Sequence, residues 1–164
     1  MNEIIEFIKK TPKAELHIHI EGTLEPELMF KLAKRNNIKI PFKNIHDVKS
    51  AYNFSSLESF LNIFYQGSNV LIKEQDFFDL TWAYTLKCKE DNVVHTEIFF
   101  DPQTHVNRGI NFDVVINGIY KALLKANKEF GLTSKIIMCF LRHLDEASAF
   151  AILDQALVHK DKII

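Results

Sequence analysis

Two histidines separated by a single residue are the most chemically distinctive feature of the sequence. His17 and His19 stand in residues 13–20, where apolar residues alternate with polar ones. A period of two predicts a β-strand, on which residues two apart project to the same side, roughly 7 Å apart at their Cα atoms. Two imidazoles so placed can hold one zinc ion, which imidazole nitrogens bind at about 2.0–2.1 Å. On spacing alone the motif is weak, and the alternative is two structural histidines on a solvent-exposed strand face.

The same alternation divides the segment between an apolar face and a polar face. The polar face carries four titratable residues: Glu15, His17, His19 and Glu21. Both faces of a parallel sheet are usually covered, so titratable groups there need partners. The histidines also stand at the end of the predicted strand, just before Gly22, and active sites of α/β proteins form at the carboxyl ends of strands. This position favours a functional site.

Further polar residues follow the later predicted strands or lie outside them. Four of them follow strand ends and either line the same site or form structural ion pairs: Asp101, Gln103, Arg142 and His143. His95 alternates with Glu97 and is compatible with a hydrogen-bonded core pair or with a site pair. The remaining histidines stand in polar surroundings and are expected at the surface: His46, His105 and His159.

Short apolar segments alternate with longer segments of helical periodicity, which predicts an α/β fold with a parallel sheet. Strands are predicted at residues 14–20, 92–101 and 136–141, with a fourth beginning at 163–164. Helices are predicted at residues 25–36, 74–90, 112–130 and about 145–158, with a loop at 41–50. One more helix begins after Ser55 or Ser56. It aligns Leu57, Phe60, Leu61 and Phe64 on one stripe, which fits core packing or a ligand contact.

The composition is that of an ordinary globular domain. The 164 residues are 47% hydrophobic and 25% charged, with a net charge of -1. Such a balance gives no electrostatic reason to bind nucleic acid or a membrane surface. No secretory signal and no run of 18 apolar residues occurs, and the two cysteines, Cys88 and Cys139, suit a reducing compartment. We therefore expect a cytoplasmic protein, while its oligomeric state stays open.

Three segments resemble one known family. Residues 12–28, which contain the motif HIHIEGT, are similar to the opening motif of the adenosine/adenine deaminase family of metal-dependent amidohydrolases. Residues 93–105 and 139–144 resemble the second and third strand regions of its adenine deaminase branch. The resemblance implies that residues 1–164 are one partial domain, the N-terminal portion (about three to four βα units) of a TIM (β/α)8 barrel.

The resemblance also implies a cofactor and a reaction. One Zn2+ ion would be bound, with His17 and His19 as two of its ligands. In that family, water activated by zinc attacks C6 of a purine and ammonia leaves, a reaction of purine salvage. Zinc suits this task because it lowers the pKa of a bound water to about 7. The implied partner is therefore a small purine.

The family further implies which residues contact the purine. The position of Glu21 is usually Asp in adenosine deaminases, where it faces the ribose, and the change to Glu favours the free base adenine. Phe60, Leu61 and Phe64 fall where the family places a helix beside the pocket entrance. These four residues are the expected substrate contacts.

Several residues that the family needs would lie beyond Ile164. They are a third metal-binding His, the His-Ala-Gly-Glu proton-donor segment, a second catalytic His and an Asp-Asp pair. A (β/α)8 barrel needs about 250 residues. We therefore expect a fragment that is inactive alone. The alternatives are adenosine deamination, another hydrolysis on the same barrel, and a non-catalytic α/β module with structural histidines.

Overall fold

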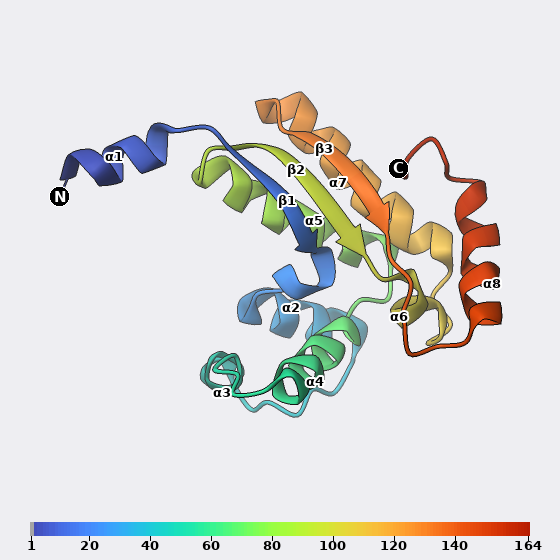
Figure 1. Ribbon diagram of the computed structural model, residues 1–164. Coiled ribbons are helices and arrows are strands. Elements are labelled where there is room, and N and C mark those ends of the chain that lie inside the picture. The colour runs from blue at the N-terminus through green and yellow to red at the C-terminus, as the bar shows by residue number, and fades with distance from the viewer. Residues whose placement is uncertain (1) are drawn as a thin grey trace.

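The computed structural model describes residues 2–164, whose strands form one parallel sheet (Figure 1). Strands β1 (Lys13–His19), β2 (Val93–Phe100) and β3 (Thr133–Met138) lie in the order β1-β2-β3. Helices occupy both connections, as parallel strands require, because the chain must return to the opposite end of the sheet. The predicted parallel α/β fold is confirmed.

The five predicted helices are present, together with three that were not predicted, at residues 2–10, 45–51 and 102–106. They are α1 (Asn2–Lys10), α2 (Pro26–Asn36), α3 (Ile45–Ala51), α4 (Leu57–Ser68), α5 (Glu74–Glu90), α6 (Pro102–Val106), α7 (Phe112–Phe130) and α8 (Glu146–Leu157), with a 3-10 turn η1 (Ile20–Thr23). Asn111 begins α7 by accepting the Asp113 N–H, and Gly131, with a φ of 74°, ends it. Within residues 2–164, no helix is long and apolar enough to cross a membrane.

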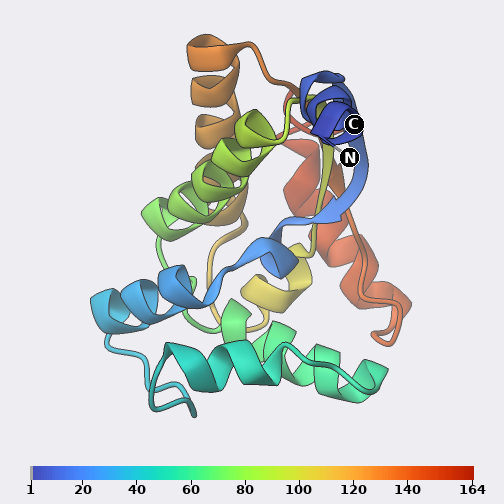
Figure 2. The same ribbon diagram turned by 90° about the vertical axis from the view of Figure 1, so that its left-hand side faces the viewer.

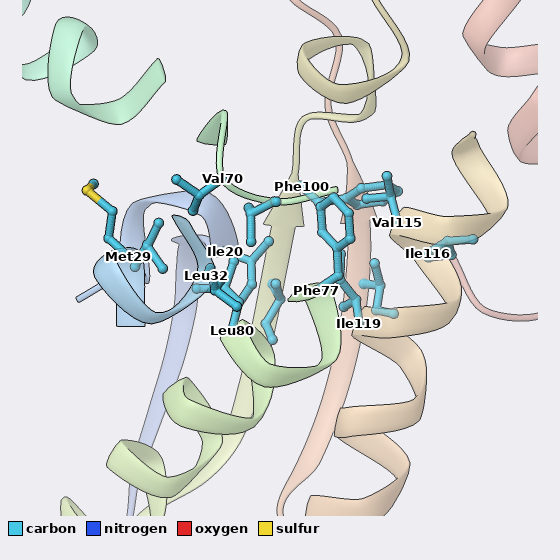
Figure 3. Packing of buried hydrophobic residues seen from close by; sticks show 14 of the residues in the cluster. Ile20, Met29, Leu32, Val70, Phe77, Leu80, Phe100, Val115, Ile116 and Ile119 are labelled. Atoms are coloured by element: carbon cyan, nitrogen blue, oxygen red, sulfur yellow. The ribbon is translucent and has the colours of Figure 1, made fainter. Parts of the chain in front are cut away.

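The core lies between the sheet and two long helices. Figure 2 shows α5 and α7 on the same side of the strands. Figure 3 shows Phe77, Ile119 and Phe100 of β2 within one cluster of buried residues. Gly118 of α7 allows the two helices to approach closely. A Cβ at that position would lie 2.5 Å from the Glu74 carbonyl oxygen and 2.6 Å from the Phe77 Cβ. One face of the sheet is therefore tightly packed.

The carboxyl ends of the strands meet a second group of elements. All three arrows in Figure 1 point towards η1, α4 and α6, whereas α1 projects away from the opposite end of β1. Side chains that follow the three strands are thus gathered at one edge of the sheet, as the sequence analysis expects for a site.

Three boundaries differ from the predictions. Residues 45–51 of the expected loop form α3, because the Asn44 side chain caps it by accepting the Asp47 N–H. β3 begins and ends three residues earlier than expected. After it, the Cys139 N–H still donates to the Phe100 carbonyl of β2, whereas the Leu141 N–H donates to the Gln103 side chain. Residues 163–164 form no strand, although the Ile164 N–H donates to the Ile136 carbonyl of β3 at 3.0 Å.

The alternation of β1 is interrupted. Glu15 pairs with Thr96 of β2 and Ile18 pairs with Ile98, so three steps along β1 match two along β2. Such an irregularity moves the following residues to the other face. Glu15 therefore lies on the face covered by α5, where the Tyr84 hydroxyl is 2.6 Å from the Thr96 hydroxyl. The prediction that Glu15 shares a face with the two histidines is wrong.

Candidate metal and substrate site

His17 and His19 lie on the same side of β1, at the carboxyl end of the strand. Their ring centroids are 5.7 Å apart. Both rings pack against Phe99 of β2, with centroid distances of 4.4 and 5.4 Å. Because the next residue, Phe100, is buried beneath the helices, the imidazoles occupy the sheet face opposite α5 and α7. The sequence correctly predicted that the two rings project together.

Asp101 fixes the orientation of one histidine. Its Oδ2 atom is 2.9 Å from Nδ1 of His19, at the point where β2 ends. This hydrogen bond raises the pKa of His19 above its ordinary value, although partial burial opposes the shift. A carboxylate that accepts from Nδ1 leaves Nε2 with a lone pair, which is the arrangement found in carboxylate–histidine–zinc sites. Nε2 of His19 is thus left available to a metal ion.

Glu21 does not stand beside the histidines on the strand but lies in the η1 turn, with only 3% of its surface exposed. Its Oε1 atom accepts two hydrogen bonds, from the Asp101 N–H at 3.0 Å and from His105 Nε2 at 3.1 Å. Its Oε2 atom is buried, and among residues 2–164 it has no hydrogen-bond partner. One carboxylate oxygen is therefore satisfied and the other is available to a donor.

His105 is a functional candidate that the sequence analysis missed. It was expected at the surface, but α6 turns it inward and it is fully buried. Its ring meets Phe77 edge to face at 4.8 Å, and its nitrogens contact Glu21 and Arg108. The sequence signal was its position just after a strand end, within a segment that resembles the family motif.

The other histidines serve the packing or the surface. His159 was also expected at the surface but is buried, because it stacks on Phe112 and bonds to Asp113 at 2.6 Å. His46 is exposed, as predicted. His95 bonds to the Thr133 hydroxyl at 2.7 Å at the beginning of β3, which supports the structural alternative for that residue.

A cavity of about 490 Å³ opens over the two histidines. Asp101 lines it together with three residues of α4: Phe60, Leu61 and Phe64. The buried side of α4 is instead formed by Ile63 and Gly67, and Leu57 is 72% exposed. Three of the four residues of the apolar stripe predicted on this helix therefore face the cavity rather than the core, and the fourth, Leu57, lies at the surface.

Glu21 adjoins a second, much smaller space. This cavity of about 20 Å³ shares Gly22, Phe60 and Phe64 with the larger one, so the two spaces adjoin each other. A third hollow, of about 890 Å³, runs along α2 and α5, but its described lining contains no histidine. Without imidazole ligands it is a poor candidate for the same chemistry.

The region after β3 adds one thiol and is supported by an amide of α6. The Cys139 sulfur and ligand atoms of His19 and Asp101 lie within 4.8 Å of one another. Burial raises the pKa of the Cys139 thiol to about 11. Gln103 is buried and supports the following loop through its bond to the Leu141 N–H at 2.7 Å. The neighbouring residues that were expected to line the site, Arg142 and His143, are exposed.

The donor set fits a zinc ion. Two imidazoles project together, and one has its Nδ1 occupied by a carboxylate, so nitrogen ligands of the kind zinc prefers are in place. Two ligands do not complete a catalytic zinc site, which takes three or more from the protein. The described chain therefore offers part of such a site.

Parallel strands that alternate with helices, with the polar residues gathered at the carboxyl edge, define part of a (β/α) barrel of the amidohydrolase type. The family model described as adenosine deaminase matches residues 12–164. The chain belongs to the adenosine deaminase family.

Particular relatives are adenine deaminases. That of Psychrobacter cryohalolentis is 63% identical over 161 residues, which are 98% of this chain and 48% of the relative. That of Wolinella succinogenes is 58% identical over 164 residues, or 100% of this chain and 50% of the relative. The chain spans about half the length of the curated relatives it matches.

Solved structures show the same architecture. Adenine deaminase from Arthrobacter aurescens superposes with a TM-score of 0.87 at 44% identity, covering 92% of this chain and 46% of that one. An amidohydrolase from Burkholderia ambifaria with bound Zn has a TM-score of 0.84 at 23% identity, covering 96% and 44%. The second likeness concerns the fold alone.

Proposed function

We propose that the full-length protein catalyses the zinc-dependent hydrolysis of adenine to hypoxanthine and ammonia, and that residues 1–164 form the N-terminal part of its catalytic domain. The observation that carries the proposal is the His17–His19 pair, held at the carboxyl edge of the sheet with Asp101 on His19. The high identity to adenine deaminases supports adenine as the substrate.

Three of the described residues would bind the metal ion or orient one of its ligands. His17 and His19 would bind the ion, and Asp101 would hold the Nδ1 proton of His19 so that Nε2 stays free for the metal. A bound zinc ion supplies a water whose pKa is lowered to about 7, and hence a nucleophile at neutral pH. The remaining ligands and the general acid are expected from the rest of the protein.

The substrate would lie in the cavity over the histidines. Phe60, Leu61 and Phe64 give it an apolar wall, against which a flat purine ring can pack while water is excluded. Glu21 would accept a hydrogen bond from the base where the smaller cavity adjoins the larger one. Both interactions orient the purine rather than transform it.

The proposal is tested by ammonia release from adenine and from adenosine, together with zinc analysis of the full-length protein. His17→Ala and His19→Ala should each lower the zinc content and reduce turnover of adenine by more than about 100-fold. His46→Ala, at an exposed histidine of α3, is the matched control and should retain both. Unchanged zinc content in the first two variants would refute the metal site.

The substrate comparison separates the alternatives. A clear preference for adenosine would show that the nucleoside, and not adenine, is the substrate. Turnover of neither compound would favour another hydrolysis or a non-catalytic role. Residues 1–164 alone should release no ammonia, because we expect the general acid to lie in the remainder of the protein. We also expect the protein in the cytoplasm, on the evidence of its two free cysteines.

A further inference from the structure

A buried chain of hydrogen bonds connects Glu21 to Arg108 through the ring of His105. His105 Nε2 is 3.1 Å from Glu21 Oε1, and Nδ1 of the same ring is 3.0 Å from an Nη2 atom of Arg108. The side chains of His105 and Glu21 are 0% and 1% exposed. The contacts lie where α6 turns back beneath the carboxyl edge of the sheet.

The chemistry of the guanidinium fixes the tautomer of His105. An arginine side chain carries only donors, so the imidazole nitrogen facing it must be an acceptor. Nδ1 of His105 is therefore unprotonated, and the ring proton is on Nε2. That N–H points at Glu21 and donates to Oε1, so Arg108 determines which hydrogen bond the ring can give.

Arg108 is itself held in place by backbone carbonyls. It donates to the carbonyl oxygen of Ser68, the last residue of α4, at 3.0 Å and to that of Leu71 at 3.1 Å. It also donates to the Thr104 carbonyl oxygen at 3.1 Å. These bonds make Arg108 part of the support of α4. His105 makes no such contact with α4, so its substitution tests the link to Glu21 separately.

Glu21 receives a second donor on the same oxygen. The Asp101 N–H is 3.0 Å from Oε1, so two N–H groups converge on one oxygen while Oε2 stays buried without a partner among residues 2–164. A buried acceptor without a donor is unfavourable, because it has lost its hydrogen bonds to water. A ligand donor that reaches Oε2 would remove this cost.

We propose that His105 and Arg108 are positioning residues that commit Oε1 of Glu21 to the protein and present Oε2 to the substrate. The inference rests on the proposed function and deepens it. A free purine base carries an N–H on its five-membered ring, whereas a nucleoside has a glycosidic bond in that place. Oε2, presented as an acceptor, would therefore distinguish the free base from its N9-substituted forms.

The test measures kcat and KM of the full-length enzyme for adenine and for 9-methyladenine, which lacks the N9 hydrogen. We expect the wild type to prefer adenine by about 100-fold or more in kcat/KM, because a site built around a hydrogen bond rejects the analogue without it. His105→Asn loses the donor to Glu21. It should raise KM for adenine about 10-fold and leave kcat within about 3-fold of the wild-type value. The preference for adenine over 9-methyladenine should also fall about 10-fold.

His105→Gln is the matched rescue. Its amide reaches the place of Nε2 and can still donate to Glu21, so KM and the preference should stay close to those of the wild type. In Glu21→Gln, the two fixed donors should hold the amide oxygen at the Oε1 position. The NH2 group then replaces Oε2, which turns the acceptor into a donor, and the preference for adenine should collapse.

The outcomes are separable. Absence of adenine turnover in the wild type overturns the proposed function and this inference with it. Turnover by the wild type with an unchanged KM and preference in His105→Asn overturns the positioning role alone. If His105→Asn does not fold, or does not bind zinc at the wild-type level, Glu21→Gln is used as the test instead. A preference that survives that substitution also refutes the inference.

Discussion

The two faces of the sheet bury different kinds of side chain, although they share the same three strands. On the face beneath α5 and α7, Ile98 and Phe100 are fully buried in a continuous apolar core. On the other face, His17 and His19 pack against Phe99, and polar groups from the strand ends are joined by hydrogen bonds. Successive residues of β2 thus contribute alternately to folding and to the site.

The difference shows how the fold separates stability from chemistry. The core face depends on close contact, and an added Cβ at Gly118 has no space. The site face depends on the orientation of its polar groups. The Asp101 side chain bonds to His19, and the Asp101 backbone N–H donates to Glu21. Substitutions on one face should therefore affect the free energy of unfolding, and those on the other should affect metal and substrate binding.

The largest effect is expected from the adjacent pair Phe100 and Phe99. Phe100→Ala removes a fully buried ring that contacts Phe112 at 5.9 Å, and it should lower the free energy of unfolding by about 3–5 kcal/mol. Phe99→Ala removes the ring on which both histidines pack, so it should weaken zinc binding more than stability. Urea unfolding measures the free energy of unfolding of each full-length variant, and zinc titration measures its affinity for zinc. Equal losses of stability would contradict the separation of the two faces.

A smaller loss of stability is expected where α5 and α7 approach most closely. Gly118→Ala would force apart backbone atoms that cannot yield, because the new Cβ meets the Glu74 carbonyl and the Phe78 nitrogen at 3.0 Å or less. The expected cost is about 3 kcal/mol, at the upper end for overpacking. Gly109→Ala is the control. Its φ of 83° carries strain of about 1–2 kcal/mol, but nothing lies within 4 Å. Thermal unfolding that ranks Gly109→Ala as the more damaging would refute this account of the core.

On the site face, Asp101→Asn should weaken zinc binding by about 10–100-fold, because the carboxylate no longer fixes the tautomer of His19. The control is Asp113→Asn, which alters another carboxylate–histidine pair, with His159, outside the site. It should leave zinc affinity unchanged. Chelator competition on the full-length protein measures both affinities, and a similar loss in the two variants would show that Asp101 has no special role.

Local patterns made most of the fold predictable from the sequence. Periodicity placed the residues of α5 and α7 at their observed positions, and Gly131 marked the end of α7. The pairing of His17 with His19 also followed from spacing within one strand. Each of these features depends on residues that are close in the chain, so each could be read without knowledge of the packing.

The errors concern residues whose environment is set by distant parts of the chain. His105 was placed at the surface because its neighbours are polar, but a fully buried position results from its contacts with Glu21 and Phe77. Glu15 was assigned to the wrong face because the irregularity of β1 depends on its register with β2. The role of Asp101 as the link between His19 and Glu21 likewise required the two strands to be placed side by side.

The smallest effect is expected at the beginning of α4, the helix that carries the apolar wall of the site. The sequence left Ser55 and Ser56 as alternative caps, and the structure shows Ser56 accepting the Ser59 N–H at 3.2 Å. Ser56→Ala should destabilise the first turn of α4 by about 1 kcal/mol, whereas Ser55→Ala should have no measurable effect. Hydrogen exchange of the α4 amides resolves the difference. Because Phe60 lies one turn from this cap, faster exchange in Ser56→Ala should be accompanied by a modest rise in KM for adenine. Faster exchange with an unchanged KM would show that the position of Phe60 does not limit substrate binding.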